Sequence, residues 1–537
     1  MISVSGDTLA LASTASLTAG ARVDFAAAGG ALTVGAAGNL AIDTAATVSA
    51  LLTRLGQAAH TADGNTIADG AAASAITFAS SFVVTNLDLE ATGTVSQTAA
   101  TAVTASTLTG HVGTLILDRS NLFTSLGSFS GTNGLTLSNA KPLDATGTAT
   151  TGSSSTLTLT AQGDLTIHPT ANLSGGTLSL NTGAGGNVVG DGTLTATTLG
   201  GTVAGNAVFS NAANHVTKLA GFTTGGDFAI RNAELLEVTG VVQANGATLA
   251  LTTAGTLTVD AAARLTGGTV TLTTTGAAAD VANAGTISAT VLTGSVSGAV
   301  SFGGNANAIA QLDAFTTGGG FSLVDTGPLT VTGAVQAGAG TTLKLTADTL
   351  SFTSGGALAF GGALAANRAQ LSADAMSLSP STAGVNASSG TVALAPREVT
   401  KNITAGGNDT GLNLTAADIA KVTAGRLDLG SLDGINAAAA SIALTGGLDL
   451  DAVSGATTLG LFATGAVTQA AALTNVATLT GNAGSVTLGT AGNTVAKLGA
   501  FTTANAFALV DGGPLDVTGA VRAGVASPTG GTPNLLL

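Results

Sequence analysis

Cysteine, tryptophan and tyrosine are absent from this chain of 537 residues, and methionine occurs only twice. Without cysteine the fold can contain neither disulfide bonds nor thiolate metal sites, and a chain free of thiols is compatible with export. Aromatic residues, which fill much of the core in globular proteins of this size, make up only 3% of the chain. This composition favours a thin core built from small and β-branched aliphatic side chains.

Charge is also scarce, since only 8% of residues are charged, and 29 acidic against 15 basic groups give a formal net charge of −14. Nucleic acid is therefore excluded as a partner, because phosphate neutralisation requires clustered Lys and Arg. The mean hydropathy of +0.49 calls for a test of membrane insertion. No apolar run reaches the roughly 18 residues of a spanning helix without interruption by Thr, Gly, Ser or Asp, so no transmembrane segment is predicted.

One sequence segment occurs four times along the chain. It reads NAIAQLDAFTTGGGFSLVDTGPLTVTGAVQA from Asn307, and similar text starts at Asn121, Asn214 and Asn493. The starts lie 93, 93 and 186 residues apart, which predicts a copied unit of 93 residues and one divergent or replaced copy near residue 400. A fixed period of this kind indicates one repetitive array instead of several globular domains.

Short segments with strict alternation of apolar and polar residues predict strands that have one buried and one exposed face. In TLKLTA, Leu343 and Leu345 are expected to point inward, and the Thr and Lys residues between them outward. Clusters of Gly, Asn and Asp separate these segments and supply turns. About 20 residues per coil, with each coil covering the apolar face of the next, predict an all-β parallel β-helix. The alternating segments lie at 156–161, 177–182, 248–253, 269–274 and 342–347.

The repeat divides the chain into four predicted parts. A short helical excursion from the coils is expected near 50–75, where Leu51, Leu52, Leu55 and Ala59 have helix-like spacing. The parts are 1–120, β-helix coils; 121–399, three tandem units of 93 residues; 400–492, a divergent unit; and 493–537, a partial repeat with the C-terminal end.

The divergent unit contains a second predicted helix near 415–425, in the text TAADIAKVTAG. Thr415 is the expected N-cap, Asp418 occupies the third helical position, and Gly425 is the expected stop. Both helices are interpreted as small decorations that close a coil.

Residues with catalytic or ligand-binding chemistry form no recognisable motif. His60, His111, His168 and His215 lie far apart in the sequence and are each expected on the surface without a partner. The patterns HExxH, CxxC, GxxxxGK and GxSxG do not occur. We therefore predict no catalytic, cofactor-binding or metal-binding residues and no cofactor, so that the protein is expected not to be an enzyme.

Two alternatives remain open at this point. The carboxylate pairs Asp449 with Asp451 and Glu234 with Glu237 could serve a carbohydrate-active β-helix enzyme of the polysaccharide lyase or hydrolase type. Solvated carboxylates at turns are the simpler interpretation of these pairs. The outward Thr residues of segments such as TLTLT and TVTLTT could instead form a face that binds ice or another ordered surface, although Thr is also a common residue on the exposed side of strands.

The copied text resembles the repeat region of the filamentous haemagglutinin-like adhesins, large exported β-helix proteins of Gram-negative bacteria. The resemblance rests on N-x-[VI]-x-x-L-x-x-F-[TS], then F-x-[LI], then L-x-V-T-G-x-V, found at Asn214, Asn307 and Asn493 and more weakly at Asn121. The passage SGTVALAPREVTKNITAGGNDTGLNLTAADIAKVTAGRLDLGS from Ser389 also resembles a recurring segment of these proteins.

The resemblance implies a right-handed parallel β-helix that is exported through an outer-membrane secretion partner by type V secretion. It further implies a cell-surface or secreted adhesin stalk or passenger, acting in cell adhesion or biofilm formation on a host or abiotic surface that includes glycans. The start of the chain, MISVSGDTLALASTASLTAG, lacks the basic and continuous apolar regions of a signal peptide. We therefore expect a fragment of a longer extracellular or cell-surface protein.

Overall fold

The computed structural model is an all-β parallel β-solenoid of about 21 turns, with 62% strand and 2% helix. This confirms the predicted fold class, while the right-handed winding stays a prediction. The structure describes residues 75–79, 81–98, 101–183, 185–304, 306–406 and 411–524, together with the backbone of short strands between residues 2 and 67 and at 535–536.

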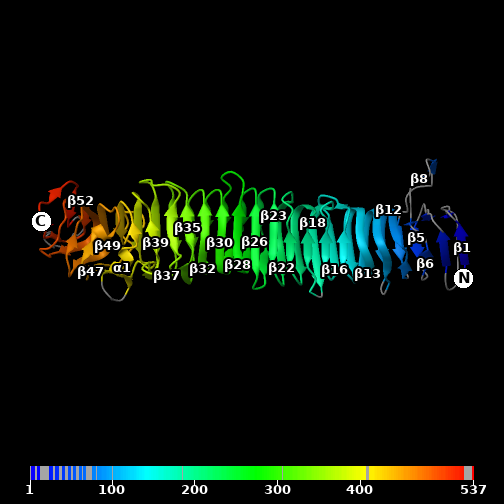
Figure 1. Ribbon diagram of the computed structural model, residues 1–537, viewed down its shortest axis with the longest axis horizontal. Helices are drawn as coiled ribbons and strands as arrows, with labels where there is room; N and C mark the ends of the chain where they lie inside the picture. Colours follow the sequence, from blue (N-terminus) through cyan, green and yellow to red (C-terminus); the bar gives the residue numbers. More distant parts are fainter. Residues whose placement is uncertain are drawn as a thin grey trace. The chain divides into compact units, whose positions relative to one another are not determined.

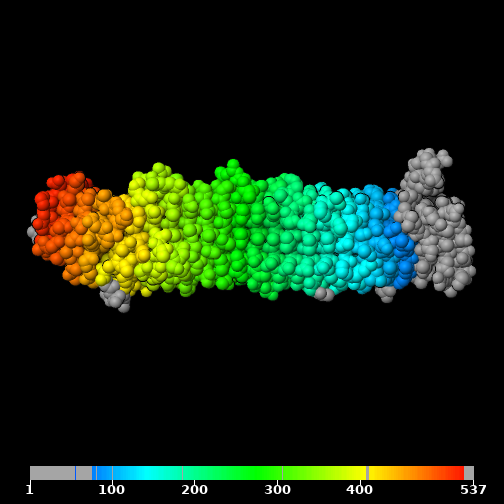
Figure 2. Space-filling view, in the orientation of Figure 1, coloured from blue at the N-terminus to red at the C-terminus, as the bar shows by residue number. Residues whose placement is uncertain are grey.

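The chain divides into two compact units, the first comprising Met1–Gly255 and Ala263–Gly268, the second Thr256–Ala262 and Thr269–Leu537. Within each unit the strands of successive turns lie side by side (Figure 1), and the turns form adjacent bands in the space-filling view (Figure 2).

Parallel pairing between residues about one turn apart builds the first unit. Leu157 pairs with Leu178, which pairs with Leu199, so that one turn takes 21 residues here. The strands of this part are β16 (Thr156–Gln162), β18 (Asn172–Gly183), β20 (Thr193–Val203), β22 (His215–Thr224), β23 (Phe228–Asn232), β24 (Leu236–Val238), β25 (Val241–Ala244) and β26 (Thr248–Thr253).

The second unit has the same parallel pairing. Leu343 of β36 (Thr342–Thr346) pairs with Ala369 of β39 (Arg368–Ser372), and Ala369 pairs with Val392. The strands that matter for the site are β39, β42 (Thr391–Ala395), β46 (Arg426–Leu429), β47 (Ile442–Leu444), β49 (Thr458–Gln469), β51 (Thr478–Leu488) and β52 (Lys497–Thr503).

The predicted inward and outward positions are confirmed where the structure describes side chains. Leu343 and Leu345 are fully buried, whereas Thr342 is exposed and Lys344 is half-buried. Phenylalanine rings add to the column, since the ring centroids of Phe315 and Phe321 lie 5.2 Å apart. Small aliphatic side chains and a few Phe rings thus form the thin core that the composition indicated.

The helical excursion predicted near 50–75 is wrong where the structure describes it. Residues Leu52–Leu55 form the strand β7, which pairs in parallel with β4 (Ala31–Val34) and β12 (Asn86–Gln97). Pairing with neighbouring turns outweighs the weak helical spacing of the leucines. Beyond β7, the antiparallel pair β8 (His60–Ala62) and β9 (Asn65–Ile67) is described, and the rest of the segment lies outside the described residues.

The second predicted helix is present but shorter than 415–425. Helix α1 (Ala416–Ile419) has Thr415 as N-cap, and the Thr415 hydroxyl and the Asp418 carboxylate form a capping box. The helix ends at Ala420, and the strand β45 (Val422–Thr423) follows at once. Val422 pairs with Val385 of the preceding turn, and this strand pairing ends the helix before Gly425.

The asparagine that opens each copy of the repeat clamps three successive turns together. Its side-chain Oδ1 accepts a hydrogen bond from a backbone N–H in the preceding turn, 18 to 20 residues earlier, at 2.8–2.9 Å. Its Nδ2 donates to the carbonyl oxygen 17 residues later, in the following turn, at 2.8–3.1 Å. All four asparagines are completely buried: Asn121, Asn214, Asn307 and Asn493.

A second position, buried in three copies and half-buried as Asp511 in the fourth, completes the clamp. The residue 18 positions after each asparagine is Asn139, Asn232, Asp325 or Asp511, and its Oδ1 accepts the backbone N–H two residues after the clamp asparagine at 2.7–2.8 Å. The copied text therefore encodes hydrogen bonds between turns, which satisfy backbone groups at a bend where the strand ladder is interrupted.

The 93-residue unit does not correspond to a whole number of turns. In the first unit the pairing runs from Phe129 to Ala149, Leu173, Leu194 and Asn214, so that four turns take 85 residues. Phe222, the counterpart of Phe129 in the next copy, lies eight residues beyond Asn214. Each copy thus advances by four turns and about one strand, and the same text occupies a different side of the solenoid in the next copy.

Candidate functional site: a flap and the groove beside it

The carboxylate pairs singled out in the sequence do not form an acid–base pair. Glu234 accepts a hydrogen bond from the His215 ring at 2.8 Å, and Glu237 forms an ion pair with Lys218 at 3.1 Å. Asp449 binds the side chain of Asn475 and the backbone of Asp451. These hydrogen bonds, the one from Asn475 above all, lower the pKa of Asp449. Glu234, Glu237 and Asp449 are thus used as surface or turn partners.

The prediction that every histidine lacks a partner is wrong for His215, because β22 and β24 bring its ring next to Glu234. A spacing of 19 residues in the sequence is close to one turn, which places Glu234, in the bend before β24, next to His215 at the start of β22. Among the residues that the structure describes, no three His, Cys, Asp or Glu side chains are grouped in a way that could hold a metal ion.

The second unit contains a loop that breaks the pattern of the regular turns. We name residues 430–440, with the sequence GSLDGINAAAA, the flap. Beneath it, side chains that alternate outward from β42, β46 and β49 are buried instead of exposed, namely Ala393, Asp428 and Phe462. The flap therefore covers the outer face of three neighbouring turns.

Hydrogen-bond donors on β39 hold the first end of the flap. The Leu432 carbonyl oxygen accepts hydrogen bonds from Nε of Arg368 at 2.9 Å, from a second Arg368 nitrogen at 2.6 Å and from Gln370 at 2.6 Å. At the other end of the flap, the backbone N–H groups of Thr464 and Gly465 donate to the carbonyls of residues 439 and 440. The flap is thus fixed at both ends.

A charged cluster lies between the flap and the strands. Arg426 donates through Nε to Asp428 Oδ1 at 2.7 Å, and Arg368 lies 3.7 Å from Asp428 Oδ2. Asp428 is completely buried, and burial raises its pKa although both arginines favour its charged form. Register explains the meeting, because Arg368 and Arg426 are both paired with Thr391 from opposite sides.

Asp433 makes the flap internally rigid. Its carboxylate accepts hydrogen bonds from the Ser431 hydroxyl, from the backbone N–H groups of Ile435 and Asn436, and from the Asn436 side chain. Partial burial opposes the charge, but these hydrogen bonds outweigh it and hold the pKa of Asp433 well below its usual range. Ile435 at the outer end of this turn is 69% exposed.

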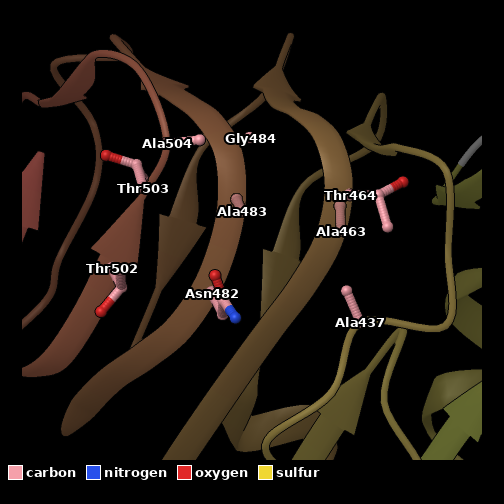
Figure 3. Close-up of a pocket in the computed structure, with 9 residues that line it drawn as sticks. All are labelled: Ala437, Ala463, Thr464, Asn482, Ala483, Gly484, Thr502, Thr503 and Ala504. Carbon is pink, nitrogen blue, oxygen red and sulfur yellow. The ribbon is translucent and has the colours of Figure 1, made fainter. Parts of the chain in front are cut away.

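A groove of about 440 Å³ lies beside the flap. Its floor is formed by β49, β51 and β52, which run next to one another, and Ala437 of the flap forms one wall (Figure 3). Asn482 and Thr502 are exposed and paired in register on neighbouring strands. The lining residues are Ala437, Ala463, Thr464, Asn482, Ala483, Gly484, Thr502, Thr503 and Ala504, none of which carries a charge.

A second concavity of about 390 Å³ lies in the first unit, over residues that include Thr101, Asp118, Arg119 and Ser138. Asp118 and Arg119 form an ion pair with each other at 3.3 Å, and the Thr101 hydroxyl donates to backbone carbonyls. These polar groups are therefore engaged within the turn.

Sequence reasoning did not find the flap or the Arg–Asp cluster. Arg368 and Arg426 are 58 positions apart in the sequence and meet only through two steps of strand pairing. A usable signal is the text GSLDGINAAAA, which lacks the alternation of the segments around it.

The threonine columns proposed as a binding face are interrupted. Along the outer face of the first unit, Thr156, Thr177 and Thr198 pair in sequence, but Lys218 and then Glu237 continue the same column. An ion pair in the middle of the column breaks the regular array of hydroxyl and methyl groups that the sequence pattern indicated.

Comparison of the chain with models of protein families, with curated proteins and with solved structures gives no match. Within the part of the chain that the structure describes, no helix has the length and hydrophobicity to cross a membrane.

Proposed function

We propose that the chain is the non-enzymatic stalk or passenger of a cell-surface or secreted adhesin, which acts in attachment or biofilm formation. The β-solenoid fold suits adhesins and β-helix enzymes alike, so the fold alone does not decide between them. The proposal rests on which positions the copied units preserve.

The copies preserve the residues that hold turns together. The clamp asparagine makes the same two hydrogen bonds between turns in all four copies. The leucine five positions later is fully buried each time, as Leu126, Leu219, Leu312 and Leu498. Repetition thus maintains the stacking of a long solenoid, which a stalk requires.

Outward positions of the copies differ from one another. Lys218 faces Glu237 in the next turn, and the copy from Asn493 keeps this chemistry as Lys497 and Asp516, but the other two copies have Ser125 with Asp144 and Gln311 with Thr330. A catalytic or ligand-binding group repeated in every unit would have to keep its chemistry. The variation favours a structural role for the repeated part.

The alternative is a carbohydrate-active β-helix enzyme, and the observation that favours it is the meeting of Arg368 and Arg426 at Asp428. Basic groups beside a carboxylate occur in sites that bind acidic sugars. Against it, Asp428 is completely buried under the flap and is held by Arg426. Incubation with acidic and neutral polysaccharides tests this alternative, because new reducing ends or unsaturated sugars would indicate cleavage and overturn the non-enzymatic assignment.

The test of location is fractionation of the source cells, followed by sequencing of the amino terminus of the species that carries TTGGGFSLVDTGP. We expect a product that is exposed to protease on intact cells or released into the medium, and that is longer than this chain. A cytoplasmic product that begins at Met1 would contradict the proposed function and leave the fold unaffected.

A further inference from the structure

We infer that the flap and the groove beside it form the recognition site of this protein, and that the site takes an uncharged, hydroxyl-rich chain of the neutral glycan class. The inference rests on the proposed function in adhesion and deepens it by naming where the stalk binds and what. It joins four observations: the groove's volume, its uncharged lining, its free polar groups and the rigid wall beside it.

The groove has the size and the polar groups of a small binding site. Its volume of about 440 Å³ falls within the roughly 300–1,000 Å³ of typical ligand sites. Asn482 and Thr502 project from neighbouring strands, and their side chains form no hydrogen bond with another described residue. An amide that donates and accepts, next to a hydroxyl that does both, matches the hydroxyl groups of a sugar.

The strand spacing favours an extended ligand. The polar residues lie on successive turns, and adjacent strands in a sheet are about 4.8 Å apart. Side-chain polar groups are therefore offered on adjacent strands along the groove, by Asn482 on β51 and Thr502 on β52. A chain molecule can contact several steps at once, whereas a compact ligand would contact only one.

Charge decides against an acidic glycan. No lining residue of the groove is basic, and the whole chain carries a formal net charge of −14, which repels polyanions. The nearby arginines do not change this, because Arg368 and Arg426 are directed to Asp428 and to the Leu432 carbonyl. The ligand that fits this environment is uncharged.

The flap supplies a preformed wall and an apolar contact. Asp433 fixes its turn through four hydrogen bonds, and the two ends of the flap are tied to β39 and β49. Ala437, which lines the groove on this rigid loop, offers an apolar surface to a sugar ring. A wall that is ordered before binding costs little entropy when the ligand arrives.

The experiment is affinity electrophoresis of the folded chain through native gels that contain hydroxyethyl cellulose or galactomannan as neutral probes, or polygalacturonate as an acidic probe. We expect retardation by at least one neutral probe and none by polygalacturonate. Two substitutions, Thr502→Val and Ala437→Asp, are each expected to weaken the retardation about tenfold in apparent Kd, which is the size of one lost contact.

Each variant has a matched control in the regular turns. Thr223→Val changes the residue that occupies the same place as Thr502 in the copy starting at Asn214, where the structure has no flap beside it. Leu235→Asp places a charge on a side chain that is 53% exposed in the same copy. Both controls are expected to bind like the unmodified chain, and circular dichroism of all four variants checks that they fold.

Equal retardation of Thr502→Val and Thr223→Val would overturn the location of the site. Retardation by polygalacturonate alone, or by no probe, would overturn the ligand class. Attachment of protein-coated beads to host cells and to abiotic surfaces is measured in parallel, because attachment that survives without glycan binding leaves the adhesin function intact, whereas loss of all attachment contradicts the proposed function itself.

Discussion

The regular turns of β22 to β25 and the flap-bearing turns of β42, β46 and β49 share the same parallel strand pairing but differ on their outer faces, which are exposed in the first and covered in the second. In β22 the outward positions Gly221 and Thr223 are exposed, and only the inward residues are buried. In β49 both Gly460 and Phe462 point outward and are nonetheless buried. The stack itself thus needs only the inward positions, and a buried outward position marks an added element.

The two regions also differ in how polar groups are satisfied. In the regular turns a buried asparagine such as Asn214 joins neighbouring turns through neutral hydrogen bonds. Beneath the flap, the buried carboxyl of Asp428 is held by Arg426 and lies beside Arg368. Neutral clamps can be copied on any side of the solenoid, whereas a charged cluster requires all its partners to be present together. This difference explains why one region recurs and the other does not.

Deletion of 93 residues from each region should give the largest difference in folding between the two. Removal of residues 121–213 places Asn214 directly after Ser120, where it meets the same neighbours as Asn121, including the Val103 N–H. We expect a folded protein with a Tm within a few degrees of the full chain. Removal of 368–460, also 93 residues, leaves no copied text to replace the lost turns, and we expect loss of cooperative folding there.

Far-UV circular dichroism and thermal unfolding of the two deletion variants measure this. Equal damage from both deletions would show that the copied unit is not interchangeable, and would remove the basis for distinguishing the two regions.

Asn214→Ala should destabilise the regular turns by about 2–6 kcal/mol, because it leaves the buried Leu194 N–H and the Arg231 carbonyl without partners, at roughly 1–3 kcal/mol each. The control is Asn245→Ala, at an exposed turn position, with an expected change within about 0.5 kcal/mol. Urea unfolding and hydrogen exchange of both variants provide the measurement. A cost for Asn214→Ala no larger than for the control would refute the clamp.

The clamp illustrates what the sequence could and could not predict. Alternation in segments such as TLKLTA was enough for the strand positions and the fold class, since inward Leu343 and Leu345 are buried as expected. The recurrence of Asn214 was visible, and asparagine is depleted in strands, so its retention signalled a special role. Its hydrogen bonds could not be assigned, because they depend on which residues one turn away meet it.

The flap was beyond the reach of pattern analysis for a different reason. Leu427 and Leu429 alternate with Asp428 as in any half-exposed strand, so the pattern alone places Asp428 in solvent. Burial of that carboxylate depends on a loop that begins two residues later and on Arg368 two turns below. Such a site is specified by several distant segments together, and none of them is unusual alone.

Gly434→Ala in the flap should lower the stability more than Gly246→Ala in a regular turn, although by less than the loss expected for Asn214→Ala. Gly434 has φ +73°, and a Cβ there would lie 3.2 Å from Asp428 Oδ2. Gly246 in the regular turns has φ +75° with no atom within 4 Å of such a Cβ. Both alanines cost about 1–2 kcal/mol for the left-handed backbone, and Gly434→Ala should cost roughly 1 kcal/mol more through crowding. Equal losses in urea unfolding would mean that the flap does not press on Asp428.

The smallest predicted effect concerns the second clamp position, which is Asn232 in one copy and Asp325 in the next. Burial, its largest influence, raises the pKa of Asp325, although hydrogen bonds from Gly327 and Ile309 and the charge of Arg397 oppose the shift. A carboxyl whose folded pKa lies above its unfolded value binds its proton more tightly in the folded state. The stability from this proton is fully present below the unfolded pKa and is lost as the pH rises through the folded pKa.

The unmodified chain should therefore gain stability relative to Asp325→Asn as the pH falls from neutral towards the ordinary aspartate range near 3.8. Asn232→Asp, which introduces a carboxyl at the matching place in the preceding copy, should acquire the same dependence. Unfolding free energies of the three proteins across this pH range measure the effect. If the stability difference between the unmodified chain and Asp325→Asn does not change with pH, the folded protein does not favour the protonated form of Asp325.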